Sequence, residues 1–263
     1  MKDLLSKYDT ITLDEMSGIK LMNRTDTKFV TSVPRLMQLL DLAKTEYRAQ
    51  IIDGNLIANY YTRYFDTAEC TMYRMHHNGH KNRQKLRIRS YIDTGINYLE
   101  VKTKNNHGRT KKKRVEMVDF DPENTAYGLH FDANADHNEG YVDFLNTYLR
   151  YDPQSMVEQL ENHFKRVTLV NKAKTERLTI DTGLAINNIV TGNAISLDEI
   201  AIIELKRDGL QPSPILGMLR QLRIMPHGFS KYCMGQAMTN PNLRCNRFKE
   251  RLRDIDRIMT GKN

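Results

Sequence analysis

Alternating charged residues in two neighbouring segments are the first feature of this sequence that could do chemistry. Bases occupy every second position over residues 85–89, and a second alternating set over residues 98–104 includes Glu100 and Lys102. Successive side chains of a β-strand point to opposite faces, so each set would share one face. The residues Asp-Thr-Gly-Ile at 93–96 favour a turn between them, which predicts a hairpin with one strongly cationic face. Like charges opposite one another on a sheet are unfavourable, so we expect an anionic ligand at this face.

Positive charge is concentrated in one part of the chain. The 263 residues carry a formal net charge of +8, and residues 81–114 contain twelve Lys and Arg residues against two acids. The rest of the chain therefore has a small negative net charge. A local excess of this kind indicates a binding site for an anion rather than a uniformly basic surface.

Length and composition are typical of one large globular domain. Of the residues, 40% are hydrophobic and 27% charged, and no stretch approaches the roughly 18 apolar residues of a membrane helix. The three cysteines, Cys70, Cys233 and Cys245, lack Cys-x-x-Cys spacing, which disfavours disulfides and structural zinc. Acidic residues near the beginning disfavour a signal peptide, so we expect a cytoplasmic protein.

The elements that would position these charges are mostly short strands joined by short connections. Strand patterns occupy residues 23–33, 57–67, 84–104, 110–120, 162–170, 174–181, 183–190 and 200–207, and helical spacing follows Pro34 and occupies residues 212–224. We therefore predict an α+β fold, with an antiparallel closed β-barrel (tunnel) of about eight strands and helices packed outside. The chain 1–263 would be a single domain, with a helical insertion at about 121–152 and a C-terminal helix at about 243–260.

Charges at period two recur in six of the predicted strands. A solvated outer face explains any one such strand on its own. Together, the six favour a shared lumen that is lined with charges and binds a polyanion, while the apolar residues of the opposite faces pack against outer helices. Glu204 is the best candidate for a metal ligand, because it lies in an apolar strand where an unpaired carboxylate is costly. Glu100 is a second candidate, and an ion pair with a neighbouring arginine explains it equally well.

Several short motifs occur in the order found in one known family. They are NRTDTKFV, RYFDT, LRIRSY, LEVKTK, ERLTID, IIELK and GFSKY, within residues 18–240. In these motifs the sequence resembles the VTC-type polyphosphate polymerase domain of the triphosphate tunnel metalloenzymes, a CYTH-like superfamily. The resemblance implies an antiparallel tunnel barrel that transfers the γ-phosphate of ATP to a growing polyphosphate chain with Mn²⁺ or Mg²⁺.

The resemblance also implies roles for individual residues. The catalytic set would be Lys28, Arg87, Arg89, Lys102, Arg166 and Lys206. The substrate-binding set would be Arg177, Ser230, Lys231 and a tunnel lysine at Lys111 or Lys113, because the run KKKR leaves the register open. Glu204 matches the metal-binding glutamate of the family. Two positions depart from the family pattern, since Phe164 replaces a tyrosine and Gly228 a lysine of the yeast-like members. The corresponding contacts to the substrate would be missing here, which concerns the strength of binding more than its type.

Three other features have simpler explanations than a functional site. His76, His77 and His80 are explained by a hairpin around Asn78-Gly79 without a metal. The basic segment 102–114 lacks the interleaved aromatic residues of a nucleic-acid loop, so we do not expect nucleic acid as a partner. Asp66 would cap a turn, and the C-terminal helix would present a solvated charged face.

Two alternatives to the polymerase stay open on the sequence. The first is hydrolysis of triphosphate or a nucleoside triphosphate in the same barrel, and the second is a non-catalytic module that binds polyphosphate or nucleotide. The hydrolase branch has Glu-x-Glu-x-Lys in its first strand, where this chain has Arg24-x-Asp26-x-Lys28. ATP and polyphosphate or pyrophosphate are the expected ligands, and a membrane-embedded partner protein and the oligomeric state are left open.

Overall fold

The computed structural model describes residues 1–17, 24–118, 120–122, 131, 139–209 and 211–261. Eleven strands in this part of the chain form one sheet. They are β1 (Asp9–Ile11), β2 (Arg24–Ser32), β3 (Tyr47–Gln50), β4 (Ala58–Asp66), β5 (Arg83–Tyr91), β6 (Ile96–Lys104), β7 (Thr110–Glu116), β8 (Val157–Asn171), β9 (Glu176–Asn188), β10 (Ala194–Leu197) and β11 (Ile200–Asp208).

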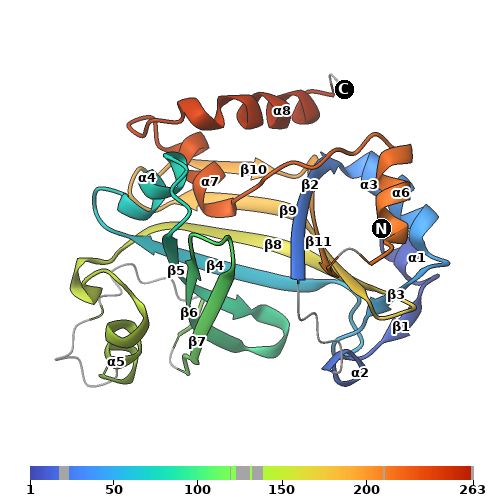
Figure 1. The fold of residues 1–263 in the computed structure, drawn as a ribbon, viewed down its shortest axis with the longest axis horizontal. Helices are drawn as coiled ribbons and strands as arrows, with labels where there is room; N and C mark the ends of the chain where they lie inside the picture. Colours follow the sequence, from blue (N-terminus) through green and yellow to red (C-terminus); the bar gives the residue numbers. More distant parts are fainter. Residues whose placement is uncertain (18–23, 119, 123–130, 132–138, 210, 262–263) are drawn as a thin grey trace.

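Eight of these strands form one continuous path in the order β2-β11-β9-β8-β4-β5-β6-β7, and all neighbours along it are antiparallel. The short strands β1, β3 and β10 lie off this path, and the β1–β3 pair is parallel. The long strands β8 and β9 form the middle of the sheet, with β2 on one side of them and the β5–β7 strands on the other (Figure 1). The described residues contain no hydrogen-bonded ladder between β2 and β7, so the structure has a large antiparallel sheet in which backbone pairing does not close a barrel.

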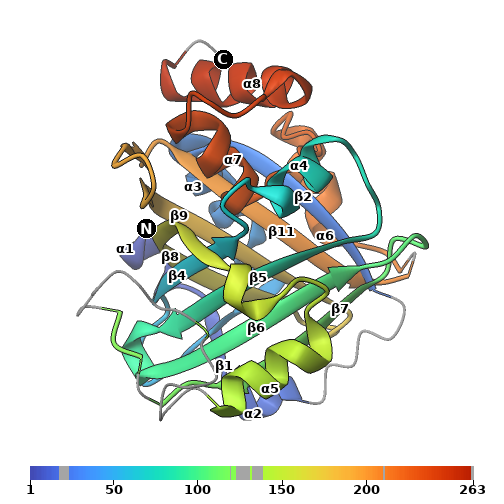
Figure 2. The ribbon, with the colours of Figure 1, turned by 90° about the vertical axis from the view of Figure 1, so that its left-hand side faces the viewer.

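The helices lie outside this sheet. They are α1 (Lys2–Leu5), α2 (Leu13–Ser17), α3 (Val33–Ala43), α4 (Thr71–His77), α5 (Glu139–Tyr148), α6 (Pro214–Gln221), α7 (Lys231–Thr239) and α8 (Lys249–Met259). In Figure 2, α8 lies above α7 and α4, and α5 lies at the opposite side of the molecule, beside β6 and β7. In the part of the chain that the structure describes, no helix has both the length and the apolar character needed to cross a membrane.

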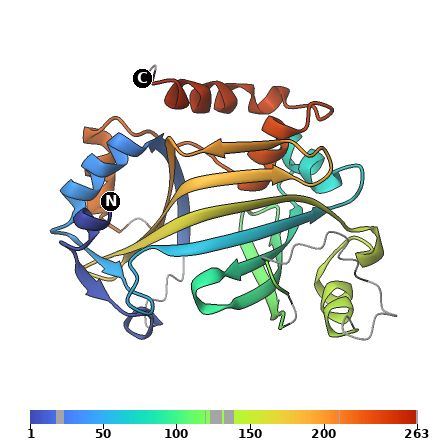
Figure 3. The ribbon, with the colours of Figure 1, turned by 180° about the vertical axis from the view of Figure 1, so that it is seen from behind.

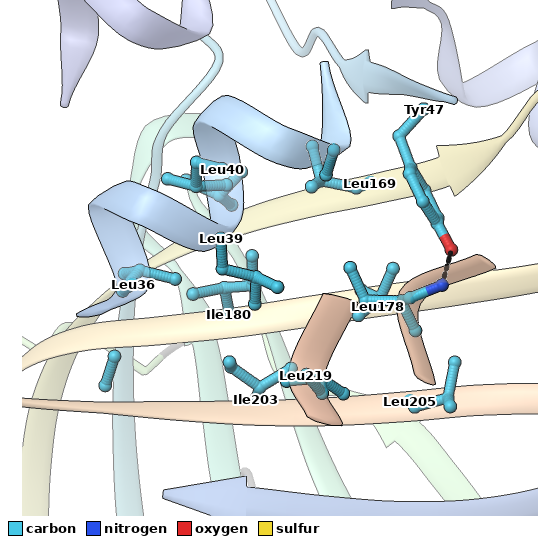
Figure 4. Packing of buried hydrophobic residues seen from close by; sticks show 14 of the residues in the cluster. Leu36, Leu39, Leu40, Tyr47, Leu169, Leu178, Ile180, Ile203, Leu205 and Leu219 are labelled. Atoms are coloured by element: carbon cyan, nitrogen blue, oxygen red, sulfur yellow. Dashed lines mark hydrogen bonds between the residues drawn. The ribbon is translucent and has the colours of Figure 1, made fainter. Parts of the chain in front are cut away.

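One face of the long strands is covered by α3 and α6 (Figure 4). Leu178, Ile180, Ile203 and Leu205 alternate along β9 and β11, and they pack against Leu39 and other apolar residues of the two helices. Burial of each such side chain contributes about 1.5–3 kcal/mol. Because these apolar residues point outward, the residues between them in sequence must point to the other face of the sheet.

Two further clusters fix the ends of the sheet. Leu86, Ile88 and Val101 of the β5–β6 hairpin pack with Leu145 of α5, inside the segment where the sequence predicts a helical insertion. At the other end α7 lies so close to the sheet that a Cβ at Gly235 would come within 2.6 Å of Leu160.

Figure 3 shows β4, β8, β9 and β10 side by side from behind, with α3 near one end of them and α8 beyond β10.

The structure changes some of the predicted elements. Residues 71–77 form α4, which ends at Asn78 and Gly79, so the predicted hairpin around these two residues is wrong. Asn78 and Gly79 favour a helix end as much as a hairpin turn, because Gly79 has a φ of +80°. The segments 174–181 and 183–190 belong to one long strand, β9, which ends at Asn188. The C-terminal helix and the helices after Pro34 and Pro214 are confirmed.

Candidate anion site on the inner face of the sheet

The predicted bases of the hairpin lie on one face, as their alternation requires. Lys85 pairs with Lys102 across β5 and β6, and Arg87 pairs with Glu100. The outward residues between them, such as Leu86 and Ile88, belong to the apolar cluster under α5. We call ten bases of this interior, together with three carboxylates, the basic cluster. Its members are Lys28, Lys85, Arg87, Arg89, Lys102, Lys112, Arg166, Arg177, Lys206 and Lys231, with Glu100, Asp181 and Glu204.

The first carboxylate of the basic cluster, Glu100, is shared by two bases. Arg87 donates from Nε and Nη2 to Glu100 Oε2 at 2.8 and 2.5 Å, and Lys112 Nζ lies 2.9 Å from Oε1. Burial alone would raise the pKa of Glu100, but the neighbouring bases hold it well below its ordinary value. Because both oxygens are engaged in ion pairs, the structure favours the ion-pair alternative for Glu100 over a role as metal ligand.

The second carboxylate, Asp181, is also shared by two bases. Arg166 donates from Nε and Nη2 to the two oxygens of Asp181 at 2.6 and 2.8 Å, and Lys231 of α7 donates to Oδ2. Burial opposes ionisation of Asp181, but Arg166 and Lys231 keep its pKa well below the ordinary value. Burial lowers the pKa of Lys231 to about 8. The side chain of Asp181 thus ties α7 to the strand that carries Arg166.

Aromatic rings lie beneath the guanidinium groups at this point. Arg166 lies 4.8 Å from the ring centroid of Tyr60 and 5.2 Å from that of Phe164, and Lys231 lies 4.1 Å from the Phe164 ring. Arg89 lies over the same two rings at 5.6 and 5.7 Å. Cation–π contacts of this kind hold charged groups in place without neutralising them. Phe164 therefore supports three bases here, although it lacks the hydroxyl of the family's tyrosine.

Bases from four strands surround the third carboxylate, Glu204. It pairs with Lys28 across β11 and β2, and its Oε2 lies 3.4 Å from Lys206 Nζ. Burial alone would raise the pKa of Glu204, but nearby bases hold it well below the ordinary value. Those bases are Lys28 of β2, Lys206 of β11, Lys102 of β6 and Arg166 of β8. Strands from opposite ends of the hydrogen-bonded path thus direct charged side chains into one shared interior.

Bases in this interior outnumber the acids. Arg87, burial and Arg89 lower the pKa of Lys102 well below its ordinary value, and Lys102 has no ion-pair or hydrogen-bond partner among the described residues. Burial, Arg87 and Arg166 lower the pKa of Arg89 to about 10. Burial also lowers the pKa of Lys206 to about 8. Burial and the neighbouring bases both disfavour the charged forms of these side chains, and a bound anion would offset both effects.

The loop before α7 lies beside the cluster. Ser230 is the N-cap of α7 and accepts from the backbone N–H of Cys233 at 3.2 Å. Lys85 Nζ donates to Ser230 Oγ at 2.6 Å, and Lys28 Nζ donates to the carbonyl of Phe229 at 3.1 Å. The predicted residues Ser230 and Lys231 therefore lie next to bases from β2, β5 and β8.

The register of β7 corrects one prediction. Lys112 pairs with Lys102 and Arg114 with Glu100, so these two side chains share the inner face. Lys111 and Lys113 point to the opposite face, where Lys113 lies 5.1 Å from the ring centroid of Tyr148 in α5. Neither predicted tunnel lysine of this run lies in the basic cluster.

Sequence reasoning placed Lys85 and Arg177 correctly on the inner face, but it gave Lys85 no role at the site and missed Asp181 and Lys112. Arg177 pairs with Lys206 across β9 and β11. Lys85 and Asp181 had a usable signal, because each lies two or four residues from a predicted site residue on the same strand. Lys112 had no local signal, since only pairing with β6 selects it from four consecutive bases.

Other predicted roles have clear outcomes. Asp66 caps the turn at Thr67 and the first turn of α4, because it accepts from the backbone N–H groups of Thr67, Met72 and Tyr73. It also accepts from the hydroxyl of Tyr232. The part of the chain that the structure describes has no group of three His, Cys, Asp or Glu side chains placed to hold a metal. Glu204 is nevertheless suited to a hard cation, because its ionised carboxylate could share the ion with phosphate oxygens of a substrate.

The fold and the cluster define a class of protein in which a large antiparallel sheet gathers bases from several strands on its inner face. A protein-family model for the VTC domain matches residues 23–240, and the chain therefore belongs to the VTC domain family.

Solved structures with a similar fold are distant in sequence. A putative adenylyl cyclase, HpAC1 from Hippeastrum, described as having a dominant triphosphatase activity, is 17% identical over 84% of this chain and 98% of its own, with a TM-score of 0.49. The PH1819 protein from Pyrococcus horikoshii OT3 is 10% identical over 81% of this chain and 98% of its own, with a TM-score of 0.42. Similarities this distant carry no argument about function. No curated protein matches the chain in sequence.

Proposed function

We propose that this protein is a metal-dependent polyphosphate polymerase that transfers the γ-phosphate of ATP to a growing polyphosphate chain. The observation that carries the proposal is the convergence of Lys28, Lys102, Arg166 and Lys206 around Glu204. Membership of the VTC domain family supports it. We also propose that side chains and bound polyanion complete a tunnel where backbone pairing leaves the sheet unclosed.

The chemistry needs little from the protein beyond positioning and charge neutralisation. A terminal phosphate oxygen of the acceptor chain forms a new bond to the γ-phosphorus of ATP. The bond between that phosphorus and the β–γ bridging oxygen breaks, and its electron pair leaves with ADP. The attacking oxygen is already ionised at neutral pH, so no side chain has to act as a general base.

The residues of the basic cluster would divide this work. Arg87, Arg89 and Arg166 would grip the triphosphate, because a guanidinium donates two parallel hydrogen bonds to phosphate oxygens. Lys102 and Lys206 would neutralise charge on the transferred group. Mn²⁺ or Mg²⁺ would be held by Glu204 together with phosphate oxygens, and it would supply further charge neutralisation there.

Hydrolysis in the same site is less well supported by the structure of the cluster. A water nucleophile needs a carboxylate or a similar group to orient it and accept its proton. Glu100 and Asp181 are each engaged by two bases. Glu204, which lies beside Lys206, would hold the metal ion. None of the three carboxylates would then be left to orient a water molecule and accept its proton.

The direct test is incubation of the pure protein with ATP and Mn²⁺, with the products separated on a gel. A ladder of polyphosphate supports the polymerase, and free phosphate alone supports the hydrolase. Unchanged ATP with tight binding supports the non-catalytic module. The variant Glu204→Gln should lose metal-dependent turnover and keep its circular dichroism spectrum, and undiminished turnover would remove Glu204 from the site.

A further inference from the structure

Three bases from three different elements meet at the loop of residues 228–230. Lys28 of β2 and Lys85 of β5 donate to Phe229 and Ser230, as described above. The third base is Arg251 of α8, whose guanidinium lies against Gly228, because a Cβ at Gly228 would come within 3.4 Å of its Cζ. The loop itself is held on β2, since the backbone N–H of residue 227 donates to the carbonyl of Lys28 at 2.7 Å.

Arg251 owes this position to the packing of α8. Ile255 is fully buried, and Leu252 and Ile258 pack against the same apolar cluster, so one side of α8 is fixed on the body of the protein. The half-buried Arg251 then points toward the loop, with its guanidinium 5.9 Å from the ring centroid of Phe248. The helix lies outside residues 23–240, the part that the family model matches.

More bases face the same place from the β5–β6 hairpin. Arg83 pairs with Lys104 across the two strands, next to the Lys85–Lys102 pair. Burial lowers the pKa of His76 in α4 to about 2, and four bases add to the effect. They are Lys85, Arg83, Arg251 and Lys104. Side chains from β5, β6 and α8 therefore converge on one neutral imidazole.

The carboxylate of Asp254 in α8 lies 3.6 Å from Nε2 of His227, next to this loop. The bases of this group are nevertheless not paired with acids as Arg87 and Arg166 of the basic cluster are. Arg87 and Arg166 each have a buried carboxylate. For Lys85, Lys104 and Arg251, by contrast, no carboxylate lies within ion-pair distance in the described part of the chain. Bases that converge without a built-in counter-ion need a mobile one, and a chain of phosphates can supply several negative charges in a row.

We propose that Arg251 of α8 completes a second anion site on the 228–230 loop, which binds the phosphates of a polyphosphate chain beyond those held at Glu204. The proposal rests on the proposed function. Lys28 connects the two sites, because it pairs with Glu204 across the strands and its ammonium group reaches Phe229. The absence of a side chain at Gly228 leaves room for the guanidinium, which grips phosphate through two parallel donors.

The test compares two charge-removing variants of the same helix. Arg251→Gln removes the base at the loop, and Arg253→Gln removes an exposed base elsewhere on α8. Affinities of each protein for tripolyphosphate and for a long-chain polyphosphate are measured by calorimetry at one salt concentration, after circular dichroism has confirmed the fold. We expect Arg251→Gln to weaken binding of the long chain about tenfold, which is ~1.4 kcal/mol. Its affinity for tripolyphosphate, and both affinities of Arg253→Gln, should change less than about twofold.

The experiment distinguishes failure of the second site from failure of the proposed function. Equal losses in Arg251→Gln and Arg253→Gln would mean that only net charge matters, and would overturn the second site. An equal loss for tripolyphosphate and for the long chain in Arg251→Gln would overturn it as well, because the two sites would not be separate. If the unmodified protein binds neither anion, the proposed function fails, and the second site fails with it.

Discussion

Two groups of buried charges on neighbouring parts of the same sheet have opposite proportions of acid and base. On the outer face of β4 and β8, Arg63 is 1% exposed and lies between Glu158 and Glu161, at 2.7 and 3.5 Å. Its Nε also donates to the hydroxyl of Tyr61 at 2.7 Å. On the inner face, each of the carboxylates Glu100 and Asp181 serves two bases. The outer group has two acids for one base, and the inner group has two bases for each of these acids.

If the proposed function holds, this difference separates charges that hold the fold together from charges that bind a ligand. The charges of the Arg63 group are paired with one another and closed off from solvent. The basic cluster is satisfied only in part, since Lys102 has no partner in the described part of the chain and its pKa is lowered by Arg87 and burial. We therefore expect the unliganded basic cluster to lower the stability of the folded protein, and we expect a bound anion to raise it.

The largest expected effect tests the outer group. Arg63→Met would leave Glu158 and Glu161 buried without their base, and breaking a buried ion pair in this way costs about 3–5 kcal/mol. Urea denaturation followed by circular dichroism should show this loss in the free energy of unfolding. The matched variant Arg253→Met, at an exposed position, should change it by less than about 0.5 kcal/mol. A loss below about 1 kcal/mol in Arg63→Met would remove the contrast between the two groups.

The second prediction concerns the inner group and its ligand. Tripolyphosphate at about 100 times its Kd should raise the free energy of unfolding by ~2.7 kcal/mol, because it binds only the folded state. Lys102→Met should lose most of this increment, and without ligand it should be at least as stable as the unmodified protein. Thermal and urea unfolding with and without tripolyphosphate measure both quantities. Destabilisation of unliganded Lys102→Met to the level of Arg63→Met would show that Lys102 is a structural charge instead.

Adjacent lysines of β7 provide a finer test of the inner face. Lys112→Ala should weaken tripolyphosphate binding about fivefold, or ~1 kcal/mol. The variant removes a base from the cluster and leaves the charge of Glu100 less neutralised, so that Glu100 repels the anion more strongly. Lys113→Ala, on the outer face beside Tyr148, should change the affinity less than about twofold. Calorimetric titration of both variants decides the register. Equal losses would place both lysines, or neither, near the ligand.

The smallest expected effect is a dependence on pH. Burial lowers the pKa of Lys206 and Lys231 to about 8 in the folded protein, below the ordinary value of a lysine in the unfolded chain. Between these values the unfolded state binds more protons, so the stability of the unliganded protein should rise with pH above about 8. The expected gain is on the order of 1 kcal/mol from pH 8 to pH 9. The stabilisation by tripolyphosphate should fall over the same range, because the lysines lose their charge. Urea titrations at several pH values would contradict this if unliganded stability fell above pH 8.

Much of the fold, and the face on which the charged side chains of each strand lie, could be predicted from the sequence, because strand alternation is a local property. The period of two fixed which residues of 85–89 and 98–104 share a face, whatever the rest of the chain does. It also separated outward Leu86 and Ile88 from inward Arg87 and Arg89, and the buried apolar cluster confirms this separation. The sequence predicted about eight strands, and the sheet has eleven, because the short strands β1, β3 and β10 were not predicted.

The tertiary structure alone decided the contacts between distant segments. Local pattern could not choose Lys112 over Lys113, because that choice depends on the register with β6. Nor could it join Asp181 to Lys231, or place Arg251 against Gly228, since each pair comes from elements far apart in the chain. Alternation orients a side chain relative to its own strand, but only the packing of strands and helices against one another determines which charges meet.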